Sequence, residues 1–184
     1  MMDLEDDHSL LERIQHDDNP ECFGILYERH KARVFRIIAK IVLDEAAAED
    51  LTQDTFMKAS LHLGRFEKRS SFQTWLCRIA VNNANAHLRK EITRRRHTHS
   101  LRSEGGNGHN GLTPRHSLFW KEENSRVTAA METLEPHLRT SLVLTVIEGM
   151  DVAEAARIQR CTRSTMYWRV HQARKQLKRV LGYA

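Results

Sequence analysis

The sequence predicts an all-α protein made of two small helical domains joined by a flexible linker. Only three prolines and eight glycines occur among 184 residues. No segment alternates apolar and polar residues as half-buried strands do, and apolar residues recur with a helical period on both sides of one polar stretch. That stretch, "HTHSLRSEGGNGHNGLTPRH" (97–116), has too few apolar residues to order itself. We therefore expect domains over 1–96 and 121–184, with a linker over 97–120.

The first domain is expected to contain helices over 9–15, 20–42, 46–63 and 71–95. In the third helix, which begins "AAAEDLTQDTFMKAS" (46–60), one side is suited to a core and the other is acidic and polar. The core side comprises Ala48, Leu51, Thr52, Thr55, Phe56 and Ala59, and the outward side comprises Asp50, Gln53, Asp54 and Met57. Such a stripe is usually just solvated, but it also suits charge-assisted bonds to arginines of a partner.

The stretch "LGRFEKRSSFQTWLCRIAVNNANAHLRKEITRRR" (63–96) interleaves aromatic residues with cations, hydroxyls and amides. Phe66, Phe72 and Trp75 bracket a short cationic loop, and an amide-rich helix follows. Aromatic rings can stack on bases while cations meet phosphates, so this composition suits single-stranded nucleic acid. Of the three rings, Trp75 is expected in the core.

The second domain is expected to contain helices over about 118–134, 136–148, 152–158 and 163–180. Short helices separated by tight turns and followed by a long basic helix form the order of a helix-turn-helix. Ala155 and Ala156 allow the short helices to cross closely, and Thr162 or Ser164 is expected to cap the long helix. Arg160 stands where the turn usually has glycine, so either the arginine adopts a positive φ at roughly 1 kcal/mol or the turn differs.

The long helix, within "CTRSTMYWRVHQARKQLKRVL" (161–181), has one apolar stripe and one face that mixes aromatic residues with cations. The stripe comprises Met166, Val170, Ala173, Leu177 and Val180. The other face comprises Arg163, Ser164, Tyr167, Trp168, His171, Arg174, Lys175 and Lys178. Exposed aromatics gain nothing from water, so we expect the N-terminal half of this helix to enter a DNA major groove, with Arg169 and other cations near phosphates or guanines. The alternative is a basic helix on a protein or membrane surface.

The net charge of +5 hides an asymmetry, because residues 1–21 contain eight acidic residues and one arginine. The remainder is therefore strongly basic, which favours nucleic acid as a partner over a merely well-solvated surface. No stretch approaches the roughly 18–20 apolar residues of a membrane span, and the acidic start is unlike a secretion signal. Three scattered cysteines suit a reducing compartment. A cytoplasmic protein without membrane insertion is expected.

No catalytic constellation is present in the sequence. It has no glycine-rich phosphate loop, no His-Glu-x-x-His motif and no paired carboxylates in an apolar setting. The linker histidines (His97, His99, His109 and His116) are loosely spaced and lack accompanying thiolates or carboxylates. We expect no enzyme activity, no cofactor and no metal site.

Three segments, in order, resemble regions 2 and 4 of the extracytoplasmic-function (ECF, group IV) sigma factors of bacterial RNA polymerase, within the sigma-70 family. They are "AAAEDLTQDTF", "RFEKRSSFQTWLCRIAVNNANAHLRK" and "LEPHLRTSLVLTVIEGMDVAEAARIQRCTRSTMYWRVHQARKQLKRVL". The resemblance covers about residues 10–95 and 122–181. It implies a factor that binds the β′ clamp and β subunits of core RNA polymerase, directs it to promoters and helps to melt them. It also implies a response to an extracytoplasmic or stress signal under an anti-sigma factor.

The resemblance adds roles to the residues singled out above. The helix that docks on the β′ clamp is matched by Asp50, Gln53 and Asp54. The −10 element is expected to meet Phe66, Lys68, Arg69, Ser70, Ser71, Asn82, Asn85 and Arg89. The −35 element is expected to meet Arg163, Ser164, Tyr167, Trp168, Arg169, His171 and Arg174.

Two departures prevent the base preferences from being carried over. Glu67–Lys68–Arg69 replaces a commoner Arg-Gly-acid sequence, and Tyr167 and Trp168 stand where relatives often have small or basic residues. Three other functions remain as alternatives. A stand-alone helix-turn-helix regulator would bind duplex DNA tightly without polymerase, a small nuclease would use the linker histidines, and a helical adaptor would leave the cationic aromatic face unexplained.

Overall fold

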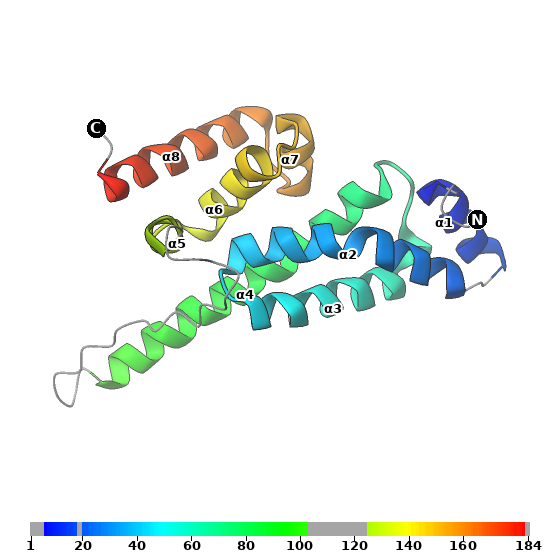
Figure 1. Ribbon diagram of the computed structural model, residues 1–184, viewed down its shortest axis with the longest axis horizontal. Helices are drawn as coiled ribbons and strands as arrows, with labels where there is room; N and C mark the ends of the chain where they lie inside the picture. The colour runs from blue at the N-terminus through cyan, green and yellow to red at the C-terminus, as the bar shows by residue number, and fades with distance from the viewer. Residues whose placement is uncertain (1–5, 18–19, 103–124, 183–184) are drawn as a thin grey trace.

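The protein, seen here as a computed structural model, consists of helices joined by short loops and turns over its described residues 6–17, 20–102 and 125–182, with no strand among them (Figure 1). This confirms the all-α prediction. The helices of the first domain are α1 (Asp7–Asp17), α2 (Pro20–Val42), α3 (Glu45–His62), the 3₁₀ turn η1 (Leu63–Arg65) and α4 (Phe72–Arg102). Those of the second are α5 (Ser125–Glu132), α6 (Pro136–Leu142), the π-helical η3 (Val143–Ile147), α7 (Val152–Ile158) and α8 (Arg163–Leu181).

The first domain is built around α2, against which α1, α3 and α4 pack. The inward face of α2 is aliphatic and consists of Leu26, Val34, Ile37, Ile38 and Ile41. The predicted core side of α3 is confirmed, since Ala48, Thr52, Thr55, Phe56 and Ala59 are buried. The two threonine hydroxyls donate to backbone carbonyls one turn earlier, at 2.7 Å each, so their burial leaves no polar group unsatisfied.

Helix α4 is longer than the sequence predicted. Residues 97–102, expected in the linker, continue the helix to Arg102. The reason is local, because neither glycine nor proline occurs between Gly64 and Gly105, so this stretch contains no residue that breaks a helix. The rest of the expected linker, 103–120, lies outside the described residues, as does the start of the helix expected over 118–134.

The helix expected over 136–148 changes its winding halfway. α6 ends at Leu142, and in η3 the Glu148 N–H donates to the Val143 carbonyl, five residues earlier, at 2.9 Å. Such π-helical turns are uncommon and often lie near functional positions. Here the wider winding ends at Glu148, a residue that contacts the first domain.

The second domain lies against the first, with α6 and α7 over α2 and α4 (Figure 1). The Glu148 carboxylate, whose side chain is 2% exposed, accepts hydrogen bonds of 2.8–3.1 Å from Arg36 and one of 3.0 Å from Lys40. Burial raises the pKa of Glu148, but the hydrogen bonds from Arg36 and Lys40 outweigh it and leave the pKa below its ordinary value. Glu148 is therefore an ionised anchor between the domains.

Three neutral or mixed contacts extend this interface. Arg139 Nη1 donates to the Ile41 carbonyl at 2.9 Å, and the Thr140 hydroxyl donates to Asn85 Oδ1 at 2.9 Å. The Thr74 hydroxyl donates to Glu154 at 2.8 Å. No sequence pattern predicted this contact, because the partners are about 55 to 112 residues apart.

Candidate nucleic-acid interface

Helix α8 has one exposed face and, opposite it, a buried seam formed by Met166 and Ala173. Met166 and Ala173 are fully buried, while Tyr167 and Trp168 are 62% and 55% exposed. The remaining residues predicted on this face are also exposed: Arg163, Ser164, His171, Arg174, Lys175 and Lys178. One residue of the predicted apolar stripe does not pack. Val180 is largely exposed, because it lies in the last turn before the helix ends at Gly182.

The start of α8 is fixed by a cap. Thr162, in an extended conformation, accepts a hydrogen bond from the Thr165 N–H at 3.1 Å, so Thr162 rather than Ser164 is the capping residue. Just before it, Arg160 adopts a left-handed φ of 49° and Cys161 N–H bonds the Ala156 carbonyl at 3.0 Å. α7 therefore ends as a helix does at a C-terminal glycine, with arginine bearing the strain.

Arg169 faces the turn rather than solvent. Its guanidinium donates to Gln159 Oε1 at 2.6 Å, and Gln159 Nε2 donates to the Ser141 hydroxyl at 2.9 Å. This chain links α8, the end of α7 and α6. The predicted DNA contact of Arg169 stays a prediction, but its side chain already braces the helix-turn-helix, a role that the sequence did not indicate.

The loop between η1 and α4 (residues 66–71) is called the −10 loop here, because the resemblance predicts that it meets the −10 element. It rests on a cluster of aromatic rings. Phe66 and Phe72 are buried and lie with Trp75 at centroid distances of 5.2–6.1 Å. Phe66 is thus placed as a support for the loop and not as a free stacking surface. Trp75 packs partly against the core, as expected.

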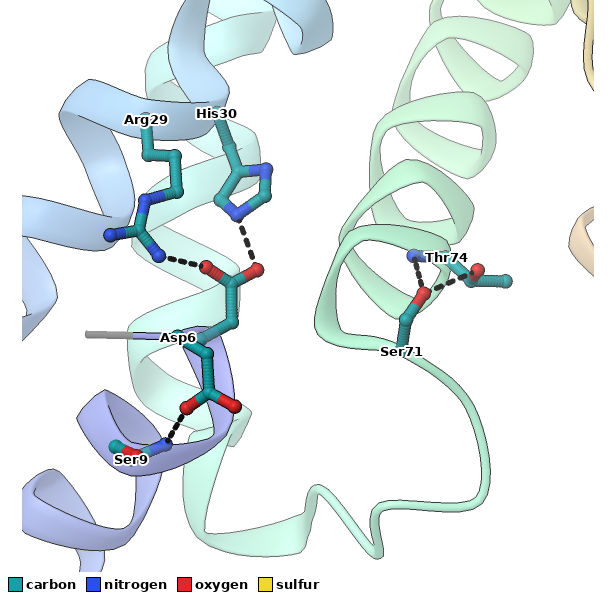
Figure 2. Close-up of polar contacts among 7 residues, drawn as sticks. Asp6, Ser9, Arg29, His30, Ser71 and Thr74 are labelled. Carbon is teal, nitrogen blue, oxygen red and sulfur yellow. Dashed lines mark hydrogen bonds and ion pairs between the residues drawn. The ribbon is translucent and has the colours of Figure 1, made fainter. Parts of the chain in front are cut away.

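The polar residues of the −10 loop divide into exposed and engaged groups. Arg69 is exposed and forms an ion pair of 2.6 Å with Glu67. Ser71 caps α4, because its hydroxyl accepts from the Thr74 N–H at 3.2 Å and also contacts the Thr74 hydroxyl (Figure 2). Lys68 adopts a left-handed φ of 54° and pairs with Glu12.

On α4, the predicted DNA residues differ in their surroundings. Asn82 and Arg89 are exposed, whereas Asn85 is half-buried and engaged by Thr140 of the second domain. Asn83 is buried and structural, since it donates to the Thr55 hydroxyl and accepts from Lys58. Asn82 and Arg89 therefore extend the −10 loop surface along one side of α4.

The outward side of α3 is a continuous stripe. Asp50 and Gln53 are exposed and Asp54 is half-buried. Met57 and Leu61 extend the stripe by two turns, and Leu61 is 76% exposed. Leu61 is not among the residues predicted from the sequence, although its position four residues after Met57 places it on the same side of the helix.

The described residues contain no group of three metal-ligating side chains. Of the linker histidines, His97 is an exposed residue of α4, the side chain of His99 is not described, and His109 and His116 lie outside the described residues. Burial raises the pKa of Cys77 to about 11, so this thiol stays protonated and is a core residue. Among the described helices, none is long and apolar enough to cross a membrane.

Comparison with known proteins gives matches over both domains. The family model described as Sigma-70 region 2 matches residues 26–96, and the one described as Sigma-70, region 4 matches residues 125–177. The RNA polymerase sigma-H factor of Pseudomonas aeruginosa is 30% identical over 188 residues, which cover 98% of this chain and 96% of that relative. The ECF RNA polymerase sigma-E factor of Haemophilus influenzae is 28% identical, covering 94% and 93% of the two chains.

Two solved structures share the fold. The structure of CnrH in complex with the cytosolic domain of CnrY has a TM-score of 0.68 and 26% identity, covering 96% of this chain and 97% of that one. The sigma factor RpoE in complex with the anti-sigma factor NepR from Bartonella quintana has a TM-score of 0.64 and 22% identity, covering 88% and 97%.

A region 2 domain followed by a region 4 helix-turn-helix defines a promoter-specificity factor of bacterial transcription. The chain belongs to the ECF sigma factors of the sigma-70 family, which direct transcription initiation and are not enzymes. This confirms the family expected from sequence resemblance and its part in transcription initiation, and the stand-alone regulator, nuclease and adaptor alternatives fall away.

Proposed function

We propose that this sigma factor places core RNA polymerase on promoters through two separate DNA-contacting surfaces, the face of α8 for the −35 element and the −10 loop with α4 for the −10 element. The observation that carries the proposal is the face of α8, where Tyr167 and Trp168 are exposed among cations on a capped helix. Aromatic side chains in this setting gain contact area only from a partner.

At the −35 element, Tyr167, Trp168 and His171 are the proposed base-contacting residues, with Arg163 and Ser164 at the entry of the helix into the major groove. Arg174 lies about two turns beyond Trp168 toward the C-terminus of α8 and is proposed to bind phosphate. Arg169 is proposed to act mainly as the brace of the turn, because Gln159 already accepts its guanidinium.

At the −10 element, an unpaired base is proposed to bind between the −10 loop and Asn82. Removing a base from the stack costs a few kcal/mol, which contacts to the extruded base and neighbouring single strand offset. Arg69, Ser70 and Arg89 are proposed as phosphate or sugar contacts, while Asn85 becomes available when Thr140 releases it.

The stripe Asp50–Gln53–Asp54 on α3 is proposed as the contact to the β′ clamp, with Met57 and Leu61 as its apolar continuation. Replacing both Asp50 and Gln53 with alanine is expected to weaken binding to core polymerase by about tenfold or more, since charge-assisted bonds contribute about 1.5–3 kcal/mol each. Glu28→Ala, an exposed acid on α2, is the matched control. Unchanged core affinity in the double variant, with helix content intact, would remove this surface from the proposal.

We also propose that an anti-sigma factor restrains this protein in the cytoplasm until an extracytoplasmic or stress signal releases it. RpoE is in complex with such a factor and CnrH with the cytosolic domain of CnrY. The contact between the two domains supports the proposal, because an inhibitor that stabilised it would keep Asn85 engaged. Co-purification with a tagged copy from its own cells, before and after envelope stress, tests it: a partner that stays bound under stress would contradict release by that signal.

The whole proposal is tested by run-off transcription with core polymerase on a genomic DNA library. The expected result is a limited set of start sites that share sequence at both elements and are absent without this chain. Start sites that are unchanged by adding the chain would refute it.

A further inference from the structure

The −10 loop has a backbone conformation that its sequence does not favour. Lys68, at the middle of the loop, has a φ of 54°, in a region that non-glycine residues rarely adopt and where only asparagine, aspartate and histidine are notably enriched. A lysine at this position needs an interaction that holds it there.

That interaction comes from α1. Lys68 Nζ lies 3.0 Å from Glu12 Oε1, across 56 residues of sequence. The same oxygen lies 3.4 Å from His8 Nδ1, within α1. Both partners of the Lys68–Glu12 pair are partly exposed, so the pair adds little to global stability. The Lys68–Glu12 pair is instead expected to orient the loop.

Helix α1 is itself held firmly in place, so it can serve as an anchor. The Asp7 carboxylate accepts 2.6 Å and 2.7 Å contacts from Arg29 and the buried His30 of α2, both of which are labelled in Figure 2. Leu10 and Leu11 are buried in the core. Helix α1 therefore connects α2, through Asp7, with the −10 loop, through Glu12.

Helix α1 and the loop region share an open pocket and two polar bonds. The pocket, of about 540 Å³, is lined by Ile14 and Gln15 of α1, by Ser60 of α3 and by residues 63–67. Across it, Gln15 Nε2 donates to the Leu63 carbonyl at 3.3 Å, where the loop region begins. These polar bonds add to the support that the buried rings of Phe66 and Phe72 give the two ends of the loop.

We propose that Glu12 is a positioning residue for −10 recognition: by pairing with Lys68 it keeps the loop in the left-handed conformation that accepts an unpaired base of the promoter strand. This inference rests on the proposed function of the −10 loop. Lys68 then serves DNA by fixing the backbone, and Arg69 and Ser70, which follow it, make the contacts. The role is distinct from that of Glu28, which forms a similar exposed pair with Lys31 away from the loop.

The test compares four full-length variants in complex with core polymerase, with the rate of open-complex formation on a duplex promoter as the measurement. Glu12→Gln is expected to slow opening about three- to fivefold, the size of a partly exposed ion pair. Glu28→Gln, the matched control, is expected to match the unchanged protein. Glycine adopts positive φ freely, so in the Lys68→Gly background the loop no longer needs Glu12, and E12Q/K68G is expected to open at the same rate as Lys68→Gly alone.

Three readouts separate the possible outcomes. If Glu12→Gln slows opening by the same factor in the Lys68→Gly background as in the unchanged protein, then Glu12 does not act through Lys68 and the positioning role is wrong. If Glu12→Gln lowers the melting temperature or core affinity and glycine does not rescue it, then Glu12 is merely structural. A template with a pre-melted −10 region tests the underlying function. If the unchanged protein fails to initiate on it, the proposed function itself is refuted. If Glu12→Gln slows opening and glycine at position 68 does not remove that effect, only the role of Glu12 is refuted.

Discussion

The proposed −35 face is carried by one helix, α8, whereas the proposed −10 surface is assembled from α1, the −10 loop and α4. On α8, a cap at Thr162 and a buried seam at Met166 and Ala173 are sufficient to present Tyr167 and Trp168. On the −10 side, buried rings, a left-handed lysine and an ion pair to a distant helix place the few side chains that remain exposed. The face of α8 therefore depends on which side chains one helix exposes, whereas the −10 surface depends on where the backbone of the −10 loop is held.

The packing behind the α8 face should give the largest effect. Met166 is fully buried, so Met166→Ala is expected to lower the free energy of unfolding of the second domain by about 2–5 kcal/mol. Thermal unfolding followed by circular dichroism measures this. If the loss were under 1 kcal/mol, α8 would not depend on this seam.

Trp168→Ala should separate recognition from folding. Because the ring is more than half exposed, stability is expected to change by less than about 0.5 kcal/mol. Affinity of the polymerase complex for promoters is expected to fall about tenfold, with weakened discrimination at the −35 bases alone. Binding measured on −35 and −10 base substitutions checks it, and a uniform loss on both sets would contradict the separation.

Low pH is expected to weaken the contact of Glu148 with Arg36 and Lys40, which holds the two domains together. The folded-state pKa of Glu148 is lowered, so its contribution is complete above the ordinary carboxyl pKa of about 4.3 and is lost as the pH falls through the lowered value. Energy transfer between labels on α3 and α8 is expected to decrease below about pH 4. Glu148→Gln should weaken the contact by about 1–2 kcal/mol at neutral pH and remove this pH dependence. An identical titration in both proteins would show that Glu148 is not the anchor.

The smallest effect is expected at the turn of the helix-turn-helix. Arg160 and Lys68 both have positive φ, but Arg160 lies in a turn closed by the backbone bond from Cys161 to Ala156. Arg160→Gly is therefore expected to stabilise the second domain by up to about 1 kcal/mol without altering start-site choice. Denaturant unfolding measures the gain, and a destabilised variant would mean that the arginine side chain supports the turn.

Periodicity predicted the parts of the fold that depend on near neighbours. The core side of α3, the buried side of α8 at Met166 and Ala173, and the burial of Ala155 and Ala156 in α7 all follow from residues within one helix. The prediction failed where composition misled it, at 97–102, since polar residues without glycine or proline can prolong a helix.

The site was less predictable because its contacts link distant segments. The Glu148 contacts with Arg36 and Lys40 and the Lys68 contact with Glu12 join residues 56 to 112 positions apart, and no local pattern marks such pairs. Phe66 was predicted to meet the −10 element but is buried, because packing against the rings of Phe72 and Trp75 is more favourable than exposure to water. The exposure of Trp168 was predictable, since it follows from its place on one helix.

Start-site mapping on a library that varies the −35 and −10 elements independently tests the central claim most directly. Reconstituted polymerase carrying Trp168→Ala is expected to lose preference at the −35 positions only, and polymerase carrying Asn82→Ala at the −10 positions only. If each variant loses preference at both elements to the same extent, then the two surfaces do not read separate parts of the promoter and the account is wrong.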